Sequence, residues 1–317
     1  MAYGRIERGI GSALSSQRGV VLITVLWVLI LLSLIAGNLS LAGRGFARQT
    51  QNIEQSTIAT QAANGGLVWA LWSLQQDEQN SWLADGSAHR MKLGEVWVNV
   101  ELYDESGKLD LNAAPTELLD ALLKPVVEED GRRAALVAAI EDWRDEDDLI
   151  RLNGAEEEEY LAAGRKQGPA NRSFESVREL LSVLGMDLEI YRQVSSNLTV
   201  RSGVRSINPV VASFEVLMTL PNASEGVVQG YIDDRRSAWS NRLPMPELPF
   251  DGAPYVSDTR SGIFFTAISS ATIEPYTRIR NIYEITRRGQ VPSVELAPPL
   301  LDGDMSQPGS GESSDEK

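Results

Sequence analysis

The sequence predicts an α+β protein carried on a long N-terminal helix, and three observations lead to this prediction. Residues 20–36 form an almost uninterrupted apolar run, and residues 95–104 alternate apolar and polar side chains as a half-buried strand does. Two further strand-like segments follow at 262–271 and 277–288, after a stretch of short helical patterns. We therefore expect a small sheet whose strands come from both ends of the protein body.

The composition bounds the possible functions. Of 317 residues, 43% are hydrophobic and 23% charged, which is enough for one or two folded domains. The formal net charge of −15 would repel nucleic-acid phosphates, so we expect no nucleic acid as a partner. With no cysteine and one histidine, disulfides, thiolate zinc sites and most hydrolytic machinery are excluded, and we expect no enzyme.

The N-terminus combines a basic flank with the apolar run. Arg5, Arg8 and Arg18 precede the run, so the positive-inside rule keeps the flank in the cytoplasm and sends the body outward. The run spans roughly 25 Å as a helix, and Leu39 and Leu41 extend it toward a full membrane crossing. Three interpretations remain open: a cleaved secretory signal, an uncleaved anchor, or a leader that is cut immediately before the run.

The helical pattern continues past the apolar run. Apolar residues recur at multiples of seven positions: Leu39, Phe46, Ile53, Leu67 and Leu74. The positions three residues further on form a heptad companion series, which includes Ala63 and Ala70. This predicts one helix over 20–76, with a transmembrane part at about 20–41. The outer half must pack on a domain or on parallel copies of itself, and a disposable signal has no need of it. Glycines, among them the pair at 65–66, weaken the helix by about 1 kcal/mol each relative to alanine.

The middle of the chain predicts short helices. Pro115 stands at the start of a helix over 116–123, and a second phrase of this kind runs from 207 into a helix over 214–220. A third helical segment lies at 173–185. These pieces resemble helix-hairpin-helix units, which bind DNA phosphates, or they form a bundle that serves only as structure. Acidic residues on the helices favour the bundle: Glu117, Asp120, Glu175, Glu179 and Glu215.

An acidic cluster is the one candidate ion site. Six carboxylates fall within 141–148, and four glutamates follow at 156–159. Calcium takes six to eight oxygen ligands and relieves such repulsion, while the alternative is a solvated acidic face. The cluster is not an EF-hand, because a frame from Asp145 places Leu149 fifth and Ile150 where the turning glycine belongs.

The remaining candidate residues predict structure rather than chemistry. His89 lies in a polar stretch that we interpret as an exposed loop with no catalytic role. The tryptophans are expected to anchor the core: Trp69, Trp72, Trp97, Trp143 and Trp239. Residues 301–317 are rich in Gly, Ser, Asp and Glu, which predicts a disordered tail.

The N-terminus resembles the class III signal of type IV pilin-like proteins. Gly19 is followed by Val20 and seven further residues of the apolar run, as in that signal. The resemblance implies that prepilin peptidase cuts between Gly19 and Val20 and methylates the new N-terminus. Members of the class carry Glu at the fifth mature position, which pairs with the N-terminus of a neighbouring subunit, whereas this chain carries Thr24. Absence of that Glu is a trait of the minor pseudopilin K family of type II secretion systems.

Phrases in the body resemble the same family over some two-thirds of the chain. They are Leu111 to Pro115, Ala139 to Asp147, Gly154 to Glu156 with Tyr160, Asn171, Ser176 to Leu180, and Ile207 to Pro209. The resemblance implies a pilin-like fold with a long N-terminal transmembrane helix, a small antiparallel sheet and a large inserted all-helical domain of the SAM or helix-hairpin-helix kind. The boundaries we expect are a leader at 1–19, the helix at 20–76, the pilin-like domain at 77–110 and 236–300, the inserted domain at 111–235, and the tail.

The resemblance also implies a function. A minor pseudopilin of this family sits at the tip of the periplasmic pseudopilus and takes part in protein export across the outer membrane. Its partners are the minor pseudopilins I and J, the other pseudopilins of the fibre, prepilin peptidase and the inner membrane, which it crosses once. Calcium binds in the helical domain, and we expect the ligands to be Asp145, Asp147, Glu156 and Asn171.

Two alternatives remain beside this one. The first is a membrane-tethered helix-hairpin-helix protein for DNA binding and uptake, and the second is a minor pilin of a type IV pilus.

Overall fold

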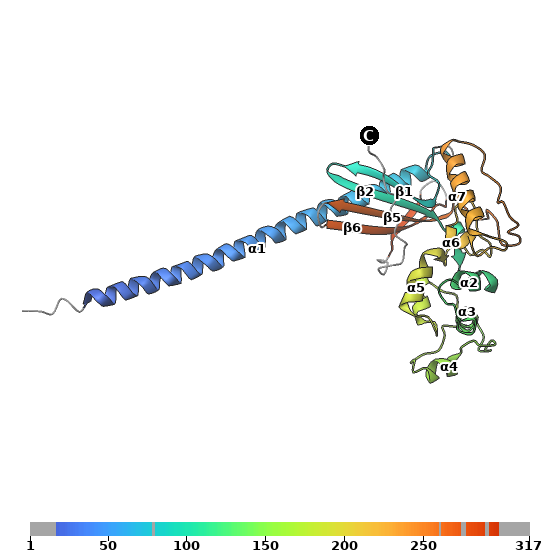
Figure 1. The fold of residues 1–317 in the computed structure, drawn as a ribbon, viewed down its shortest axis with the longest axis horizontal. Coiled ribbons are helices and arrows are strands. Elements are labelled where there is room, and N and C mark those ends of the chain that lie inside the picture. The colour runs from blue at the N-terminus through green and yellow to red at the C-terminus, as the bar shows by residue number, and fades with distance from the viewer. Residues whose placement is uncertain (1–16, 78–79, 260, 274–276, 289–291, 298–317) are drawn as a thin grey trace, which may run out of the picture. The chain divides into compact units, whose positions relative to one another are not determined.

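The computed structural model describes residues 17–77, 80–259, 261–273, 277–288 and 292–297 (Figure 1). The chain divides into two compact units, Met1–Ile58 and Ala59–Lys317, and the long helix α1 (Gln17–Leu74) contributes to both. Helix α1 covers the helix expected over 20–76 except its last two residues. The tail at 301–317 lies outside the described residues.

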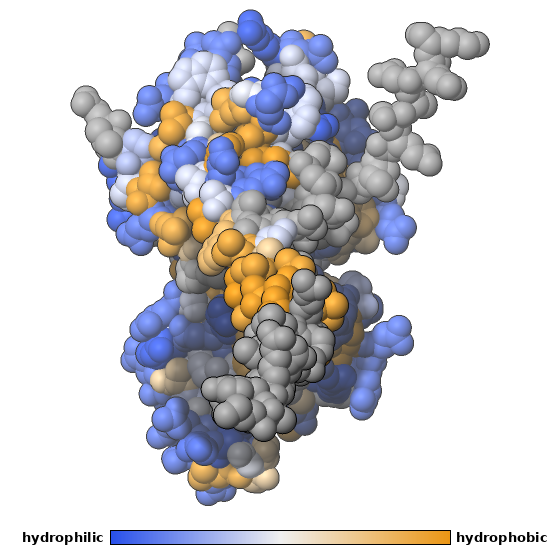
Figure 2. Space-filling model, turned by 90° about the vertical axis from the view of Figure 1, so that its left-hand side faces the viewer, coloured by the Kyte–Doolittle hydropathy of each residue, from blue (hydrophilic) through white to orange (hydrophobic). Residues whose placement is uncertain are grey.

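In the first unit, α1 carries a stretch that suits a membrane and not water. The 21 residues Val20–Ser40 are long and apolar enough to cross a bilayer, and none of them is buried within the protein. Their large hydrophobic side chains are exposed, and Figure 2, seen from the N-terminal end of α1, shows orange surface at its centre behind the grey atoms. Exposure of so many large apolar side chains to water costs about 25 cal/mol per Å², so this stretch fits a transmembrane anchor.

In the second unit, α1 packs on the sheet through small residues. Ala59, Ala63 and Ala70 are fully buried, as the heptad companion series predicts for the last two. A Cβ atom added to Gly66 would lie 2.1 Å from Ser269 Oγ, so only glycine allows the helix backbone to approach the strand this closely. Gly66 is therefore a packing residue, and its cost in helix propensity is offset by contact with the sheet.

The sheet has five antiparallel strands in the order β1-β2-β5-β6-β7. Strands β1 (Asp85–Leu93) and β2 (Val96–Asp104) form a hairpin, and β5 (Phe264–Ile273), β6 (Thr277–Thr286) and β7 (Ser293–Leu296) complete the sheet. Strand β2 pairs with β5 along its length, with Val100 opposite Ser269. Strands from the two ends of the body therefore form one sheet, as the alternating patterns predict.

A helical segment lies between β2 and β5 in the sequence. It begins with a 3-10 turn, η1 (Glu105–Gly107), and contains the helices α2 (Thr116–Leu123), α3 (Asp130–Arg144), α4 (Glu157–Ala162), α5 (Leu188–Val194), α6 (Phe214–Leu217) and α7 (Glu225–Ser240), with the 3-10 helices η2 (Val177–Ser182) and η3 (Ser195–Asn197). Two short strands, β3 (Leu109–Asp110) and β4 (Leu198–Thr199), pair in parallel within it. Its own apolar core includes Leu119, Leu136 and Tyr160. The helices lie together beyond one end of the sheet (Figure 1).

Two arginines, one buried and one partly buried, join the helical segment to the sheet. Arg235 of α7 is 1% exposed, donates to the backbone oxygens of Pro209 and Ala212, and pairs with Asp85 at the start of β1. Arg201 donates to the backbone oxygens of Phe265 in β5 and Ile285 in β6. Each guanidinium satisfies several carbonyls at once, so the segment and the sheet form one unit.

The structure corrects the prediction for His89. It lies in β1, half-buried, with its ring stacked on Trp82 at 3.9 Å between centroids, and burial lowers its pKa. The prediction of an exposed loop is wrong because β1 is an edge strand whose alternation is short: Met91 and Leu93 face the core between exposed Arg90 and Lys92, while its first residues are polar or small.

Two tryptophans and two helices also differ from expectation. Trp143 is buried as predicted, but Trp72 is 51% exposed and Trp97 is 42% exposed, so the prediction of a core role is wrong for these two. Arg90 covers the ring of Trp97 at 4.1 Å, which accounts for its exposed position. The helix expected within 173–185 is the 3-10 helix η2, and the helix expected over 214–220 is confined to α6.

The first prediction concerns Asp85. Burial alone would raise the pKa of this carboxyl, but hydrogen bonds from Ser87 and Arg236 and the charges of Arg236 and Arg235 hold it below the ordinary value. Asp85→Asn leaves Arg235 buried without its counter-charge, so we expect the free energy of unfolding to fall by about 3–5 kcal/mol. Since a depressed pKa contributes stability above the unfolded pKa, the wild type should lose this contribution as pH falls through the folded pKa, and the variant should show a flatter acid dependence.

Urea unfolding of the detergent-solubilised full chain, followed from about pH 7 to pH 3, measures both effects. Asp130→Asn is the control, because Asp130 is 90% exposed in its pair with Arg133 and should cost less than about 1 kcal/mol. Equal losses in the two variants would contradict the prediction.

Candidate metal centre

The acidic cluster lies where α3 ends and the loop to α4 begins. Glu141 and Asp142 belong to the last turn of α3, Asp145 is its C-cap residue, and Glu156 is the N-cap residue of α4. Carboxylates at the C-terminus of α3 meet the negative end of the helix dipole, so the helix itself adds to their repulsion. A compensating cation is therefore favoured here.

Asp142 is a structural member of the cluster. Its side chain is fully buried, Oδ2 accepts the backbone N–H of Ala155 at 2.8 Å, and Oδ1 accepts from Arg151 at 2.9 Å. A Cβ atom at Gly154 would lie 1.9 Å from Asp142 Oδ2. The phrase Gly154 to Glu156 thus allows the loop backbone to close on Asp142, and this brings Glu156 toward the end of α3.

Glu156 is the most unusual residue of the cluster. It is 7% exposed, and its carboxylate faces the backbone N–H of Glu159 in a capping box, but neither oxygen makes a full hydrogen bond among the described residues. Burial, followed by the negative charges of Asp142, Asp145, Asp148 and Asp147, raises the pKa of Glu156 to about 7. A buried carboxylate without a donor is costly, and a cation at this place would remove the cost.

Two further oxygens share this condition. Asp145 Oδ1 and Asn171 Oδ1 are buried, and within the described part of the chain neither has a hydrogen-bond partner. Asn171 has a positive φ of 47°, which asparagine tolerates, and its amide nitrogen donates to Asp148 Oδ1 at 2.7 Å. The other amide atom, Oδ1, is thereby left to accept from another group.

The four residues expected to bind calcium are therefore not equivalent. Asp145, Glu156 and Asn171 each present a buried oxygen without a partner, whereas Asp147 is exposed and its Oδ1 accepts the backbone N–H of Leu149 at 2.9 Å. Within the described residues, no group of three or more His, Cys, Asp or Glu side chains is close enough together to hold a metal ion as it stands. The donor chemistry fits calcium, since hard carboxylate and amide oxygens are its preferred ligands, but the side chains must close around the ion.

Sequence reasoning missed a residue of this site. Arg151, in the loop between α3 and α4, pairs with Glu141, Asp142 and Asp145. The loop sequence gives no periodic pattern that would direct this side chain, so its position depends on the tertiary fold. Arg151 supplies positive charge to Glu141, Asp142 and Asp145, whereas no ion pair to Glu156 is found in the part of the chain that the structure describes.

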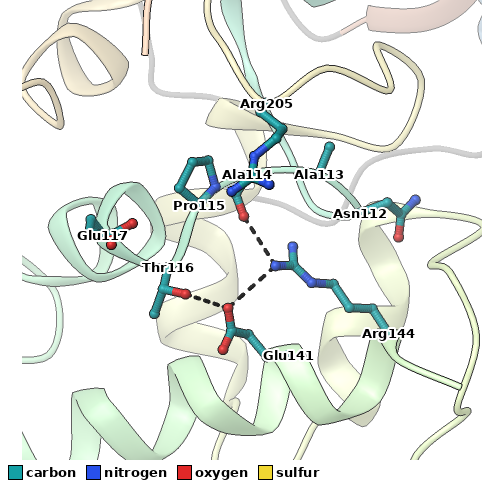
Figure 3. Close-up of a pocket in the computed structure, with 9 residues that line it drawn as sticks. All are labelled: Asn112, Ala113, Ala114, Pro115, Thr116, Glu117, Glu141, Arg144 and Arg205. Atoms are coloured by element: carbon teal, nitrogen blue, oxygen red, sulfur yellow. Dashed lines mark hydrogen bonds and ion pairs between the residues drawn. The ribbon is translucent and has the colours of Figure 1, made fainter. Parts of the chain in front are cut away.

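A pocket of about 440 Å³ lies on the other side of Glu141 (Figure 3). Its walls are the segment 112–117 and the side chains of Glu141, Arg144 and Arg205. Arg144 donates to the backbone oxygens of Leu111 and Ala114, and Thr116 donates to Glu141. These contacts fix the turn before α2, so Arg144, Thr116 and Glu141 have structural partners here.

The N-terminal candidate residues lie at the start of α1. Gly19 and Val20 belong to its first turn, where backbone N–H groups have no partner within the helix. The hydroxyl of Thr24 donates to the backbone oxygens of Val20 and Val21, both at 2.9 Å. Thr24 is thus satisfied inside its own helix, whereas a Glu at this position would need a cationic partner from elsewhere.

Comparisons with known proteins agree with these observations. The family model described as "Type II secretion system (T2SS), protein K" matches residues 98–203, which include β2, α2 to α5 and the acidic cluster. The type II secretion system protein K of Klebsiella pneumoniae is 26% identical over 242 residues, covering 66% of this chain and 74% of the relative. That of Pectobacterium carotovorum subsp. carotovorum is 28% identical over 203 residues, covering 57% of this chain and 62% of the relative.

A solved structure has the same fold. It is the crystal structure of the GspK-GspI-GspJ complex from the enterotoxigenic Escherichia coli type 2 secretion system, and the similar chain matches with a TM-score of 0.54 and 19% identity, over 80% of this chain and 99% of that one. The shared class is a mixed helix and sheet body on one apolar N-terminal helix that is long enough to cross a membrane. The sequence matches point to one particular family, because the matched model and both relatives carry the name type II secretion system protein K.

The second prediction tests the approach of the loop to Asp142. Gly154→Ala places a methyl group against Asp142 Oδ2, so the loop must move and the Ala155 N–H loses its acceptor. We expect the free energy of unfolding to fall by about 2 kcal/mol or more.

The control for this prediction is Gly226→Ala in α7, where an added Cβ meets no atom within 4 Å. It should leave stability unchanged or raise it by up to about 1 kcal/mol through helix propensity. Thermal unfolding of both variants decides the matter, and an undiminished melting temperature in Gly154→Ala would contradict the close approach.

Proposed function

We propose that the chain is cleaved between Gly19 and Val20, crosses the inner membrane once through α1, and holds its body in the periplasm. The apolar stretch Val20–Ser40 supports the crossing, and the arginines before it support the orientation. The scissile bond lies in the first helical turn, where the missing intrahelical hydrogen bonds make local opening least costly. Cleavage removes residues 1–19, and Val20 becomes the new N-terminus.

We further propose that the chain is a minor pseudopilin of the type II secretion system and lies at the tip of the pseudopilus. The observation that carries the proposal is the hydroxyl of Thr24, which is satisfied by Val20 and Val21 and therefore asks for no neighbouring N-terminus. A subunit at the tip has no subunit ahead of it, so it needs no ion pair between a glutamate at this position and a neighbouring N-terminus. The helical segment between β2 and β5 adds bulk that suits an end of the fibre better than its packed shaft.

The partners we propose are the minor pseudopilins I and J. The solved complex of similar fold contains a GspK chain together with GspI and GspJ, and this chain covers 99% of the chain it matches. The other fibre subunits, prepilin peptidase and the inner membrane complete the set. The subunit would act in protein export across the outer membrane as an assembly component and not as an enzyme.

We propose the same arrangement of domains that the resemblance implies. Residues 111–235 would be a helical domain inserted in a pilin-like domain formed by 77–110 and 236–300. The pairing of β2 with β5 supports it, because the segment leaves and re-enters the sheet between neighbouring strands.

We also propose calcium as the ion of the acidic cluster. Asp145, Glu156 and Asn171 would hold it through their unpartnered oxygens, and Asp147 would add its carboxylate on closure of the loop. Bound calcium would supply two positive charges that offset the repulsion among these carboxylates and tie the end of α3 to the start of α4. Its contribution would be to stability, by binding the folded form and not the unfolded one.

The third prediction concerns processing. In cells with active prepilin peptidase, mass spectrometry of membrane material should find a chain that begins at Val20 and carries one added methyl group. Gly19→Val should retain the leader, because the residue before the cut is changed while the apolar helix is intact. A wild-type chain that keeps Met1 under these conditions would overturn the cleavage proposal.

The fourth prediction concerns the ion. Millimolar calcium should raise the melting temperature of the detergent-solubilised full chain by several degrees, since about 2.7 kcal/mol is gained at a ligand concentration of one hundred times Kd. Glu156→Gln removes the buried charge, so it should be as stable as the wild type or more stable in EDTA, and should gain little from calcium.

Glu158→Gln, in the first turn of the same helix α4 and exposed, is the matched control and should keep the full response to calcium. No response of the wild type to calcium, or an undiminished response of Glu156→Gln, would contradict the assignment.

A further inference from the structure

Arg151 is a positive charge that the chain itself places in the acidic cluster. Its guanidinium lies 2.9 Å from Asp142 Oδ1 through Nη1 and 3.4 Å from Glu141 Oε2 through Nε, and the same Nη1 contacts Asp145 Oδ2. The three carboxylates are 0 to 20% exposed, whereas Arg151 is 42% exposed. The arginine therefore reaches in from the surface and offsets part of the charge of a buried acidic group.

Asp145 connects Arg151 with the proposed calcium site. One oxygen of its carboxylate, Oδ2, contacts Arg151, and the other, Oδ1, is buried without a hydrogen-bond partner in the part of the chain that is described. Glu156, 7% exposed, directly follows Ala155, whose backbone N–H donates to Asp142 Oδ2, and Asp142 shares Arg151 with Asp145. A cation bound to these oxygens would share a carboxylate with Arg151.

Two cations on one carboxylate weaken each other. Each draws on the same negative charge, and the two positive charges repel each other over a few ångströms, although solvent around the partly exposed guanidinium weakens this repulsion. Arg151 has one charge and is tethered, whereas calcium has two charges and takes more oxygen ligands. Arg151 is therefore suited to pair with the carboxylates in the metal-free chain and to be displaced from them when calcium binds.

The loop that carries Arg151 can move at low cost. Its neighbours Leu149 and Leu152 are 76% and 89% exposed, and Ile150 is 52% exposed, so displacement of the loop removes little buried apolar contact. The backbone N–H of Gly154 donates to Arg151 O at 2.8 Å, which keeps the turn local. Release of the guanidinium needs no change in the core of the helical segment.

We infer that Arg151 is an internal competitor of calcium: it occupies Glu141, Asp142 and Asp145 in the metal-free chain, stabilises the cluster there, and lowers its affinity for the ion. This rests on the calcium site proposed above. The metal-free subunit is thereby held folded, and the calcium concentration at which the site fills is set by the strength of the arginine pairs.

The test compares Arg151→Gln with the wild type as detergent-solubilised full chains. Isothermal titration with calcium chloride should show roughly three- to tenfold tighter binding in the variant, because the competing charge is gone. In EDTA the variant should melt several degrees lower than the wild type, and saturating calcium should close this gap. The opposite signs of the two effects distinguish competition from a merely structural role, which would weaken both binding and stability.

Two further variants complete the design. Arg151→Lys keeps the charge and should bind calcium within about twofold of the wild type. Arg132→Gln removes an arginine of similar exposure, 51%, whose partner Asp187 lies outside the cluster, and it should change neither quantity. Calcium binding by the wild type with equal or weaker binding by Arg151→Gln would overturn this inference alone. Absence of calcium binding in all four proteins would overturn the calcium site and the inference together.

Discussion

The pairing of β2 with β5 is the constraint on which the body depends. Asp104 at the end of β2 stands opposite Phe265 near the start of β5, so the chain leaves the sheet and returns at neighbouring positions. The buried carboxylate of Asp104 closes this junction, because it accepts the backbone N–H of Ser106 at 2.9 Å on the outgoing side and that of Gly262 at 2.7 Å on the returning side. Burial raises the pKa of Asp104 although these donors oppose the shift. A long helical segment is thus accommodated without any break in the sheet, and its two arginine contacts can then fix it in place.

The sequence predicts those strands and helices that have one fully buried face, and prediction from sequence fails for elements that are only partly buried. Strands β2, β5 and β6 alternate and were expected, since a central strand must separate its apolar and polar faces. Strand β1 is an edge strand, and its alternation is confined to its second half, where only Met91 and Leu93 are large apolar residues that pack on the core. Trp72 and Trp97 show a similar limit: aromatic character predicts contact, but Trp97 finds it under Arg90 at the surface. The glycine at 66 reads as a helix-weakening residue until the strand against it is known.

The acidic cluster divides in the same way. Its density of charge can be seen in the sequence, and resemblance points to Asp145, Glu156 and Asn171, each of which has a buried oxygen without a partner in the described chain. The role of Asp142 requires the fold, because its partners Arg151 and Ala155 lie 9 and 13 residues away in the loop. The need for glycine at position 154 also becomes visible only in the fold, because a Cβ atom there would collide with Asp142 Oδ2. Arg151 could not be assigned from sequence, since an exposed loop arginine follows no periodicity and is directed only by the carboxylates that it meets.

Thr24 and Glu156 show opposite solutions to one physical problem, the cost of a polar group away from water. The hydroxyl of Thr24 returns to the carbonyls of Val20 and Val21, so the membrane helix needs nothing from a neighbouring chain at that position. The carboxylate of Glu156 faces the Glu159 backbone N–H in a capping box but makes no full hydrogen bond in the described chain, so folding compensates its charge only in part. Because the Thr24 hydroxyl is hydrogen-bonded within its own helix, assembly needs no partner for it. Because the Glu156 carboxylate is already buried, a cation that binds it gains affinity by compensating its charge. The subunit therefore joins an anchor that demands no ion pair to a body whose acidic oxygens favour an added cation.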